Sequence, residues 1–505
     1  MSIGAAVLLG LALMLLIGES WLRSTKASSW ITVALFVFAG VGFIGGYAPQ
    51  LKGLATGSLA ETDAWHLFHY DLNARYLDEL GYHSLYSCAL AAAPVEAVAK
   101  VDLVRDLETY ALVPRSELSS CPRTSFTDLR WEQFRMDVAR ILTQVPLPNT
   151  SEYAGWGNDQ AAYVQAIFQD KGYNVTPFGA RLTKGLYTLF SENSWNQWRS
   201  LFIGEIVLLI VSIFIIGYGY TGRAASLYAL WLVTFWGTYP FLTNMLLQHA
   251  WLPFLVGGLV ALKKEKGILC GALFAITILL RVFPVVFLFP SLIAWVQAEY
   301  RSEKKRTFFF RSAAGSFLGT TFIGFVFGGT TSLWREYLEK LHRHSAYLRE
   351  EIFDIGIPTL SHLLGGGAGL AIVLGIALTF ALVIAMRRMS LSQQTIRMLV
   401  LLFAWFSLSP YYYSILVLLA FAWDERAKVL SRLSAIGVTL LFFAHAATGL
   451  FGLNYFSNDR GAHLASQLAI LALLLFQLGI PWIKKERLPV EEGVKAGQEN
   501  DRVAD

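Results

Sequence analysis

Long apolar runs alternate along the chain with short segments rich in lysine and arginine. A helix needs about 20 apolar residues to cross a bilayer, and most of these runs approach that length. The pattern predicts thirteen membrane spans, near residues 3–22, 29–47, 200–219, 224–243, 247–262, 266–281, 283–299, 308–328, 367–386, 396–409, 411–424, 430–451 and 462–483. A long polar stretch separates span 2 from span 3. The predicted fold class is an all-α polytopic membrane protein with a large loop.

Charge at the span ends predicts the orientation, because lysine and arginine gather on the cytoplasmic side. The basic segments 263–266 and 301–306 are both expected inside, so the apolar stretch between them crosses twice. The same rule places loops 48–199 and 329–366 outside. The N-terminus is then expected outside. The first apolar run lacks a basic start and a small-residue cleavage site, which favours a retained span over a signal peptide. These expectations describe a multi-pass membrane protein whose large loop lies on the extracytoplasmic side.

Spans and loops together divide the chain into six parts. They are residues 1–47 with two spans, 48–199 as an extracytoplasmic helical domain, 200–328 with spans 3–8, 329–366 as a second outer loop, 367–483 with spans 9–13, and 484–505 as a charged cytoplasmic tail. The chain is 55% hydrophobic and 15% charged, too few polar residues for a soluble enzyme or a disordered chain.

The outer stretch 48–199 carries 13 basic and 17 acidic residues, although the whole chain has a net charge of +5. No basic face is long enough to suggest nucleic-acid binding. The partners expected for the apolar spans are membrane lipids.

The outer loops contain three amphipathic helical patterns. The first has apolar residues three and four positions apart, at Trp65, Phe68, Leu72, Tyr76 and Leu80. The second covers 128–142 and the third 334–352. Each predicts a helix lying flat with its apolar stripe in the membrane interface. Such helices suit either a platform for a lipid-linked substrate or a simple anchor for the loops, and the pattern leaves both open.

Cysteines leave a second alternative open. Cys88 and Cys121 both fall in the long outer loop, where an oxidising compartment permits a disulfide. Two unpaired, buried thiols are an equally good interpretation. Cys270 falls in a span, and no spacing of cysteine and histidine suggests a metal site.

Asp63 is the first candidate for chemistry. It forms an acidic pair with Glu61 at the start of the first amphipathic pattern. A carboxylate there can act as a general base on a hydroxyl group, and the N–H groups of the helix terminus can face a phosphate. Aspartate before an apolar-periodic run is also a standard helix N-cap. Spacing alone favours the cap.

Arg281 is the second candidate, at the predicted outer end of a span in the sequence LLRVFPVVFLFP. Charge within a membrane is costly, and a guanidinium binds phosphate in a bidentate manner, so a functional role is favoured. The alternative is an arginine that snorkels to the interface, with Pro284 freeing carbonyls for it to cap. Glu205, also toward the outer face, is expected either to pair with Arg281 or to hold a substrate hydroxyl.

Histidines add weaker candidates. His342 and His344 flank Arg343 on the third amphipathic pattern and can bind phosphate or sugar, although a solvated face explains them equally well. His445, within an apolar span, is interpreted as a packing residue. The candidates cluster on the outer side, whereas a transporter places its polar groups near the bilayer midplane.

This order of elements resembles the GT-C superfamily, integral-membrane glycosyltransferases that use polyprenyl-phosphate sugars. The segments that carry the resemblance are Glu61-Thr62-Asp63, 69–76 (HYDLNARY) with 79–82 (ELGY) and 85–86 (LY), 172–177 (GYNVTP), 281–284 (RVFP) and the tyrosines 411–413. Among characterised branches the chain is most similar to glycosyltransferase family 87, the polyprenyl-phosphate-mannose-dependent mannosyltransferases. The resemblance covers most of the chain as architecture, and each short motif is weak by itself.

The resemblance implies transfer of a single sugar, a mannose-like hexose or a pentose, from polyprenyl phosphate to a lipid or envelope-glycan acceptor. It also implies a location in a bacterial inner (plasma) membrane, with the active site facing the extracytoplasmic side. It makes Asp63 the base, lets Arg281 stabilise the leaving phosphate and makes His344 a second phosphate contact. The remaining expected substrate-binding residues are Glu61, His69, Asp71, Arg75, Glu205 and His342. Two features depart from the family: an extra helix precedes the loop, and the acidic pair is Glu-x-Asp rather than Asp-x-Asp. No metal and no cofactor are therefore expected.

Other functions remain as alternatives. A flippase or transporter for lipid-linked glycans would need a polar path through the bilayer, which the spans hardly offer. A ligase or polymerase would share the fold and accept a whole oligosaccharide donor. A non-catalytic envelope-assembly partner would use its outer domain to bind a protein.

Overall fold

The computed structural model describes residues 3–22, 25–56, 64–144, 159–189, 194–234, 249–288, 303–320, 324, 328–348, 354–386, 389–408, 410–422, 432–453 and 460–483. Helices dominate these residues, which confirms the all-α class. One small exception is an antiparallel ribbon of β1 (Leu103–Arg105) and β2 (Leu112–Pro114) in the outer loop. Nothing in the periodicity indicates these two short strands.

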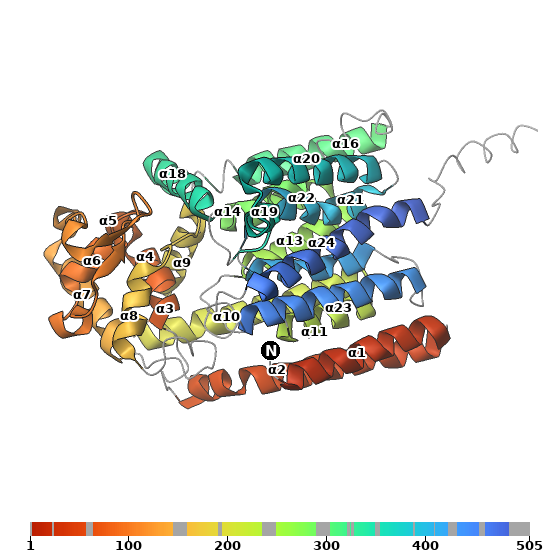
Figure 1. The fold of residues 1–505 in the computed structure, drawn as a ribbon, viewed down its shortest axis with the longest axis horizontal. Helices are drawn as coiled ribbons and strands as arrows, with labels where there is room; N and C mark the ends of the chain where they lie inside the picture. The colour runs from red at the N-terminus through yellow and green to blue at the C-terminus, as the bar shows by residue number, and fades with distance from the viewer. Residues whose placement is uncertain are drawn as a thin grey trace, which may run out of the picture.

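Long helices run side by side along the longest axis of the molecule and form a bundle (Figure 1). They are α1 (Ile3–Leu22), α2 (Thr25–Thr56), α10 (Ser194–Gly219), α11 (Gly222–Thr234), α13 (Trp251–Lys263), α14 (Gly267–Leu280), α16 (Glu303–Leu318), α20 (Gly367–Met386), α23 (Arg432–Leu453) and α24 (Arg460–Ile483). Shorter bundle elements are α19 (Ile357–Leu363), α21 (Leu391–Arg397) and α22 (Leu399–Trp405). The bounds of α1 and α20 coincide with predicted spans 3–22 and 367–386.

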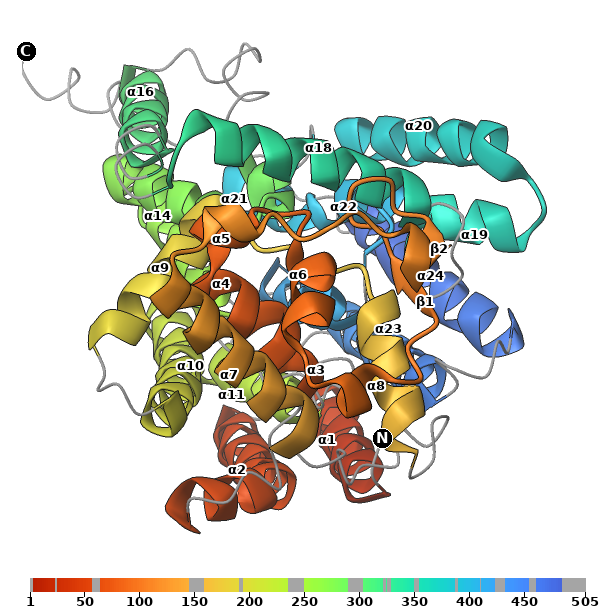
Figure 2. The same ribbon diagram turned by 90° about the vertical axis from the view of Figure 1, so that its left-hand side faces the viewer.

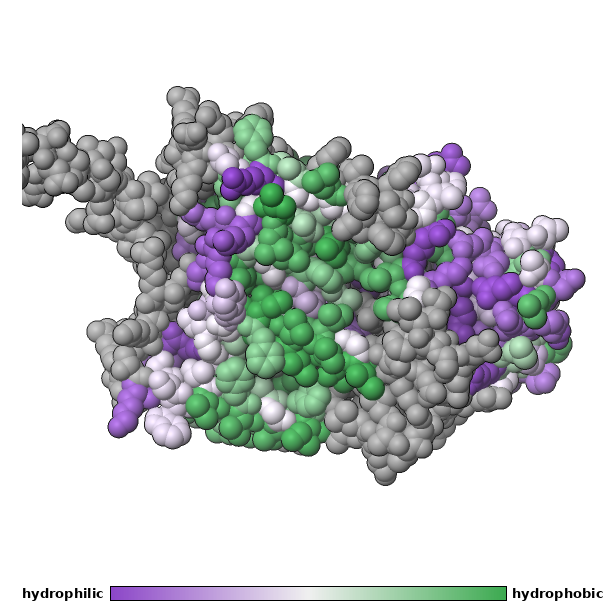
Figure 3. Space-filling view, turned by 180° about the vertical axis from the view of Figure 1, so that it is seen from behind, coloured by the Kyte–Doolittle hydropathy of each residue, from purple (hydrophilic) through white to green (hydrophobic). Residues whose placement is uncertain are grey.

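The bundle presents apolar side chains outward. Figure 3 shows a hydrophobic belt between two more hydrophilic ends. Among the described residues, three segments are long and apolar enough to cross a membrane: Lys26–Gly45, Gly367–Met386 and Arg460–Gly479. Five shorter apolar helices accompany them: Val7–Trp21, Ile203–Gly219, Trp251–Lys263, Gly267–Leu280 and Ile436–Ala447. The structure thus supports membrane-spanning helices, and the number thirteen stays a prediction.

Among the described residues, two predicted spans contain 3₁₀ helix in place of regular α-helix. Span 283–299 begins as the 3₁₀ segment η6 (Phe283–Leu288), and span 411–424 lies largely in the 3₁₀ segment η9 (Pro410–Ala422). Proline lacks the N–H of a regular helix, and Pro284 and Pro410 stand at these two starts.

Helices α14 and α16 approach closely through paired glycines. A Cβ on Gly271 would lie 2.0 Å from the Ser312 carbonyl oxygen, and one on Gly315 would lie 2.3 Å from the Ile268 carbonyl oxygen. Gly267 and Gly271 are four apart on one helix, and Gly315 and Gly319 repeat that spacing in the facing segment. Small residues at this spacing are how membrane helices pack backbone against backbone.

At one end of the bundle, short helices form an outer domain from residues 64–144 and 159–189 (Figures 1 and 2). They are α3 (Ala64–His66), the π-helical η1 (Leu67–Leu72), α4 (Asn73–Arg75), α5 (Leu77–Leu80), α6 (Leu85–Ala92), η2 (Val95–Val98), η3 (Arg115–Glu117), η4 (Arg123–Ser125), α7 (Asp128–Gln144), α8 (Gln160–Gln169) and α9 (Pro177–Leu189). Helix α18 (Thr331–Leu348) lies along one edge of this domain (Figure 2).

All three amphipathic patterns form helices, but the first two do not place their stripes in the membrane interface. Phe68, Leu72 and Tyr76 are buried inside the outer domain, together with Phe134 and Val138 of the second pattern. On α18 the buried residues are Leu333, Tyr337 and Lys340. Periodicity identifies an apolar stripe correctly, but it cannot say whether lipid or protein covers it.

A disulfide joins Cys88 of α6 to Cys121, whose Cα atoms lie 4.5 Å apart. This resolves the alternative that the sequence left open. Cys270 is a free, buried thiol in α14.

Candidate functional site: a pocket between the outer domain and the bundle

A pocket lies where the outer domain meets the bundle. Its walls come from the π-helix η1, the loop before α9, α9 itself, and helices α13 and α14. The lining residues are Tyr70, Tyr173, Val175, Gly179, Leu182, Thr183, Ala250, Trp251, Leu280 and Arg281. Several of them can donate hydrogen bonds, and one carries a permanent positive charge.

Arg281 supplies that charge. Helix α14 ends at Leu280, and Arg281 has an extended backbone, with φ of −147°, that turns the chain into η6. Its side chain is buried, 4% exposed; Nη1 donates to the Asn174 carbonyl at 3.5 Å, and Cζ lies 5.8 Å from the centre of the Tyr412 ring. The guanidinium is therefore fixed at the junction and does not reach out toward solvent, as snorkelling would require.

Two tyrosines line the same pocket. The rings of Tyr70 and Tyr173 meet edge to face, with centroids 6.0 Å apart. Burial raises the pKa of Tyr173 well above 10, although the nearby Arg281 opposes that shift. Tyr173 therefore stays a neutral phenol at physiological pH and offers an O–H donor.

Trp251 forms part of the wall at the start of α13. It is 1% exposed, and its ring packs edge to face on Phe283, with centroids 5.1 Å apart. Phe283 in turn packs on Tyr412 at 4.7 Å. The indole N–H of Trp251 finds no acceptor among the described residues.

Behind the wall, Glu205 of α10 meets His249. A carboxylate oxygen of Glu205 accepts from the His249 backbone N–H at 2.6 Å and lies 3.3 Å from His249 Nδ1. His249 directly precedes the pocket residues Ala250 and Trp251. Glu205 is 2% exposed and holds the segment that leads into α13. Its role toward a substrate hydroxyl stays a prediction.

Asp71 and Arg75 lie together on the outer domain's first helical segment. Arg75 pairs with Asp71 and with Asp137 of α7, each at 3.4 Å. Burial raises the pKa of Asp137, and Arg75 opposes the shift. These charges join two helices of the outer domain. Asp71 nevertheless lies close enough to Tyr173 to affect its pKa.

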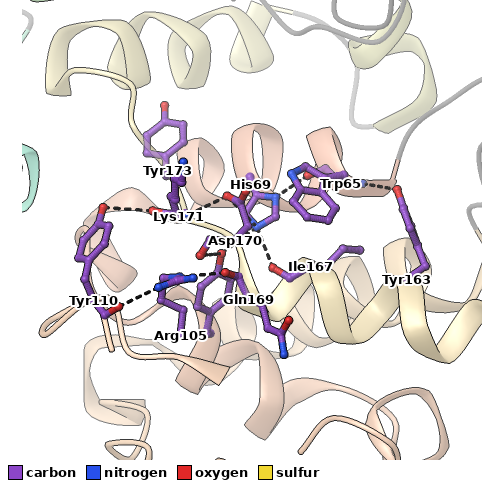
Figure 4. Close-up of polar contacts among 12 residues, drawn as sticks. Trp65, His69, Arg105, Tyr110, Tyr163, Ile167, Gln169, Asp170, Lys171 and Tyr173 are labelled. Carbon is purple, nitrogen blue, oxygen red and sulfur yellow. Dashed lines mark hydrogen bonds and ion pairs between the residues drawn. The ribbon is translucent and has the colours of Figure 1, made fainter. Parts of the chain in front are cut away.

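His69 is enclosed in the outer domain and is 1% exposed. Its Nδ1 lies 2.8 Å from the Trp65 carbonyl oxygen, and Nε2 lies 2.9 Å from the Tyr86 hydroxyl and 3.7 Å from Asp170 (Figure 4). Burial lowers the pKa of His69. The ring is engaged on both nitrogens, so its geometry suits packing better than the predicted substrate contact.

The two other predicted histidines lie on different faces of helix α18. His342 is on its exposed face, whereas His344 packs edge to face on Tyr110 at 5.8 Å. Burial lowers the pKa of His344 well below its usual value, and the cations Lys171, Lys340 and Arg105 add to the shift. His344 is not among the residues that line the pocket.

Asp63 and Glu61 lie outside the described residues, directly before α3 begins at Ala64. Their catalytic and binding roles stay predictions. Among the described residues, no three histidine, cysteine or acidic side chains are grouped as a metal site would require.

The sequence patterns do not indicate a role for Trp251, for Thr183 or for the ion pair Lys171–Asp354. The Lys171 ammonium lies 3.6 Å from Asp354, which is fully buried. No local pattern marks these residues, because the chain segments that meet there are far apart in sequence. Tyr70 and Tyr173 fall in the segments that carried the GT-C resemblance, and that was the available signal.

No family model matches the sequence, and neither a characterised protein nor a solved structure matches it significantly. The function therefore has to be argued from the chemistry of the pocket.

Proposed function

We propose that this protein is a membrane glycosyltransferase that moves one sugar from a polyprenyl-phosphate donor to a lipid or envelope-glycan acceptor. The observation that carries the proposal is Arg281, a buried cation in a donor-rich pocket at the boundary between bundle and outer domain. A donor with a lipid tail and an anionic headgroup presents both parts at such a boundary. Guanidinium and phenol donors suit its phosphate.

The surroundings of the pocket agree with an extracytoplasmic reaction. The outer domain contains the Cys88–Cys121 disulfide, and disulfides persist in oxidising compartments such as the bacterial periplasm. Asp63 precedes the pocket residue Tyr70 by only seven residues along the chain. The proposal therefore assigns the base to the segment that leads into the pocket residue Tyr70.

In the proposed reaction the acceptor oxygen bonds to the anomeric carbon while the bond from that carbon to the phosphate oxygen breaks. The bonding pair leaves with the polyprenyl phosphate, and the hydroxyl proton passes to Asp63. Arg281 stabilises the negative charge that develops on the departing phosphate. Attack opposite the leaving group inverts the anomeric centre.

A carrier for lipid-linked glycans is the second candidate, favoured by polar residues buried along α24. His463 and Gln467 lie toward one end, while Gln477 lies toward the other end, where its carbonyl accepts from Arg397 at 3.2 Å. Between them α24 buries only apolar side chains at Ile470, Leu473 and Leu474. The polar groups thus form two separate clusters instead of a path, which favours the transferase.

The test compares the glycolipid and envelope-glycan mass profile of cells lacking the protein with rescue by wild type and by Asp63→Asn, at matched membrane abundance. We expect a species short by one sugar to accumulate, and only wild type to extend it. Asp102→Asn, the same change at an exposed acid of the outer domain, is the matched control.

Arg281→Gln should also fail to rescue, whereas Arg335→Gln, at a position 76% exposed, should succeed. Full rescue by Asp63→Asn overturns the catalytic assignment. A profile in which whole glycans are missing from the outer face supports the carrier instead.

A further inference from the structure

The loop between α8 and α9, residues 170–176, is held by side chains from distant parts of the chain. Five of its carbonyl oxygens accept hydrogen bonds: Asp170 from Tyr86 Oη at 3.0 Å, Lys171 from Tyr110 Oη at 3.2 Å, Tyr173 from Lys340 Nζ at 2.7 Å, Asn174 from Arg281 Nη1 at 3.5 Å and Val175 from Tyr82 Oη at 2.8 Å. Figure 4 shows the first part of this loop among its partners. The loop passes from these anchors directly into the pocket wall.

Lys340 is the unexpected donor in this set. It belongs to α18, is 1% exposed, and its ammonium lies 5.8 Å from the centre of the Tyr82 ring. Gly172, with φ of +71°, gives it room, because a Cβ at that position would lie 3.2 Å from Lys340 Nζ and 2.9 Å from Leu107. The loop is therefore shaped to admit the lysine.

Burying a lysine is costly, and α18 offers an exposed face on which a lysine would cost nothing. The bond it makes goes to the residue that matters most for the pocket. Tyr173 contributes its ring to the wall, and the next carbonyl, that of Asn174, is the acceptor for Arg281. Two cations from different helices thus hold consecutive carbonyls.

We propose that Lys340 is a positioning residue, which fixes Tyr173 and, through the adjacent carbonyl, Arg281 in the geometry that binds the donor phosphate. The proposal rests on the proposed function for its ligand, but the anchoring itself does not depend on any ligand. It gives α18, a helix outside the outer loop's own sequence, a direct role in forming the pocket.

The protonation state of Lys340 provides a distinctive readout. Burial lowers the pKa of Lys340 to about 7, and Asp170 opposes the shift. The groups that face it are Asp170 and Tyr173 from the loop, Tyr82 from the segment after α5, and His344 on α18 itself. Below neutrality Lys340 donates a charge-assisted bond, and above it a neutral amine donates a weaker one.

The experiment uses the full chain in lipid nanodiscs, with farnesyl phosphoryl mannose as the probe. Its phosphodiester does not titrate between pH 6 and 9. We expect wild-type affinity to fall as pH rises through about 7. Lys340→Met should weaken binding at pH 6 by about tenfold, the loss expected for one charge-assisted hydrogen bond, and should abolish the pH step.

Two variants separate positioning from general damage. Tyr82→Phe removes the neighbouring anchor at Val175 without touching a charge, so it should weaken binding but keep the pH step. Lys184→Met, at a lysine of α9 that is 34% exposed, should leave both unchanged. A pH step that persists in Lys340→Met overturns the proposal.

Hydrogen exchange of residues 170–176 gives a test without ligand. The amides of this loop should exchange faster in Lys340→Met than in wild type, while those of α7 should not change. If wild type does not bind the probe but the loop responds in this way, the proposed function fails and the anchoring role stands. Unchanged exchange in the loop of a folded Lys340→Met protein refutes the anchoring role.

Discussion

The outer domain and the bundle use opposite arrangements of the same residue types. In the outer domain, Phe68 and Phe134 are fully buried, whereas Arg135 of α7 is exposed and pairs with Glu132 at the surface. In the bundle, Phe214 and Phe380 are 73% and 67% exposed, whereas His445 and Gln467 are fully buried. The outer domain buries its apolar side chains, as a protein surrounded by water does. The bundle exposes apolar side chains and buries polar ones, as a protein surrounded by lipid does.

The contrast explains what a charge in the sequence means in each region. A charge within a bundle segment has to be buried against a partner, because lipid offers none. Arg281 and Arg397 are both enclosed in this way. In the outer domain a charge is usually a solvated group, and Lys340, buried at that domain's edge, is an exception.

The largest expected effect comes from truncating a phenylalanine inside the outer domain. Phe134→Ala should lower the free energy of unfolding by about 3–5 kcal/mol, because it leaves a cavity in a packed core. Phe380→Ala should cost about 0.5 kcal/mol or less, since that ring faces outward from the bundle. Denaturation in detergent, followed by circular dichroism, measures both. Equal losses of unfolding free energy in the two variants would contradict the contrast between the outer domain and the bundle.

Next in size is the loss of the disulfide. Cys88→Ser should lower the stability of the outer domain by about 2–4 kcal/mol, because the bond closes a loop with a sequence separation of 33. Thermal unfolding with and without reductant tests this. Cys270→Ala in the bundle is the control, and its melting temperature should depend on reductant as that of wild type does. A wild-type melting temperature that ignores reductant would contradict the prediction.

A bulky residue between α14 and α16 should have a somewhat smaller effect. Gly271→Val forces apart two backbones in direct contact, at a cost of about 1–3 kcal/mol. Gly204→Val in α10 is the control, because a Cβ there meets no atom within 4 Å. The measurement is the detergent concentration at which each variant loses its monodisperse profile. Equal behaviour of the two variants would contradict the packing role.

Acid should produce the smallest effect, confined to the outer domain. The pKa of His69 is lowered in the folded protein, so only the unfolded chain gains a proton as pH falls below 6.5. Stability is therefore lost as the pH falls below 6.5. His69→Gln should flatten this slope in urea titrations. A slope that steepens in the variant would show the opposite linkage.

Local sequence patterns predict the helices well and their surroundings poorly. The limits of α1 and α20 follow from apolar length alone. The sequence also predicts the apolar stripe through Phe68 and Tyr76, yet this stripe packs against α7 and α8 instead of lipid. Periodicity records that a face is apolar, and the partner of that face depends on contacts far apart in sequence.

The candidate site shows the same limit. Arg281 could be recognised because a charge between two apolar runs is costly. Trp251 and Lys340 could not, since an aromatic residue at a span start and a lysine on an amphipathic helix are both ordinary in sequence. The α14–α16 glycine pairs, by contrast, are visible in the spacing of the sequence alone.

The loop of residues 170–176 also imposes an order on biosynthesis. Its anchor Tyr82 is made early, Arg281 follows, and Lys340 comes 258 positions after Tyr82. At 5–20 residues per second, the ribosome needs on the order of tens of seconds to cover that distance. During that interval the sequence of the outer domain is complete but its last anchor, Lys340, has not been made. A chaperone or an oxidoreductase that acts on the domain has that interval in which to do so.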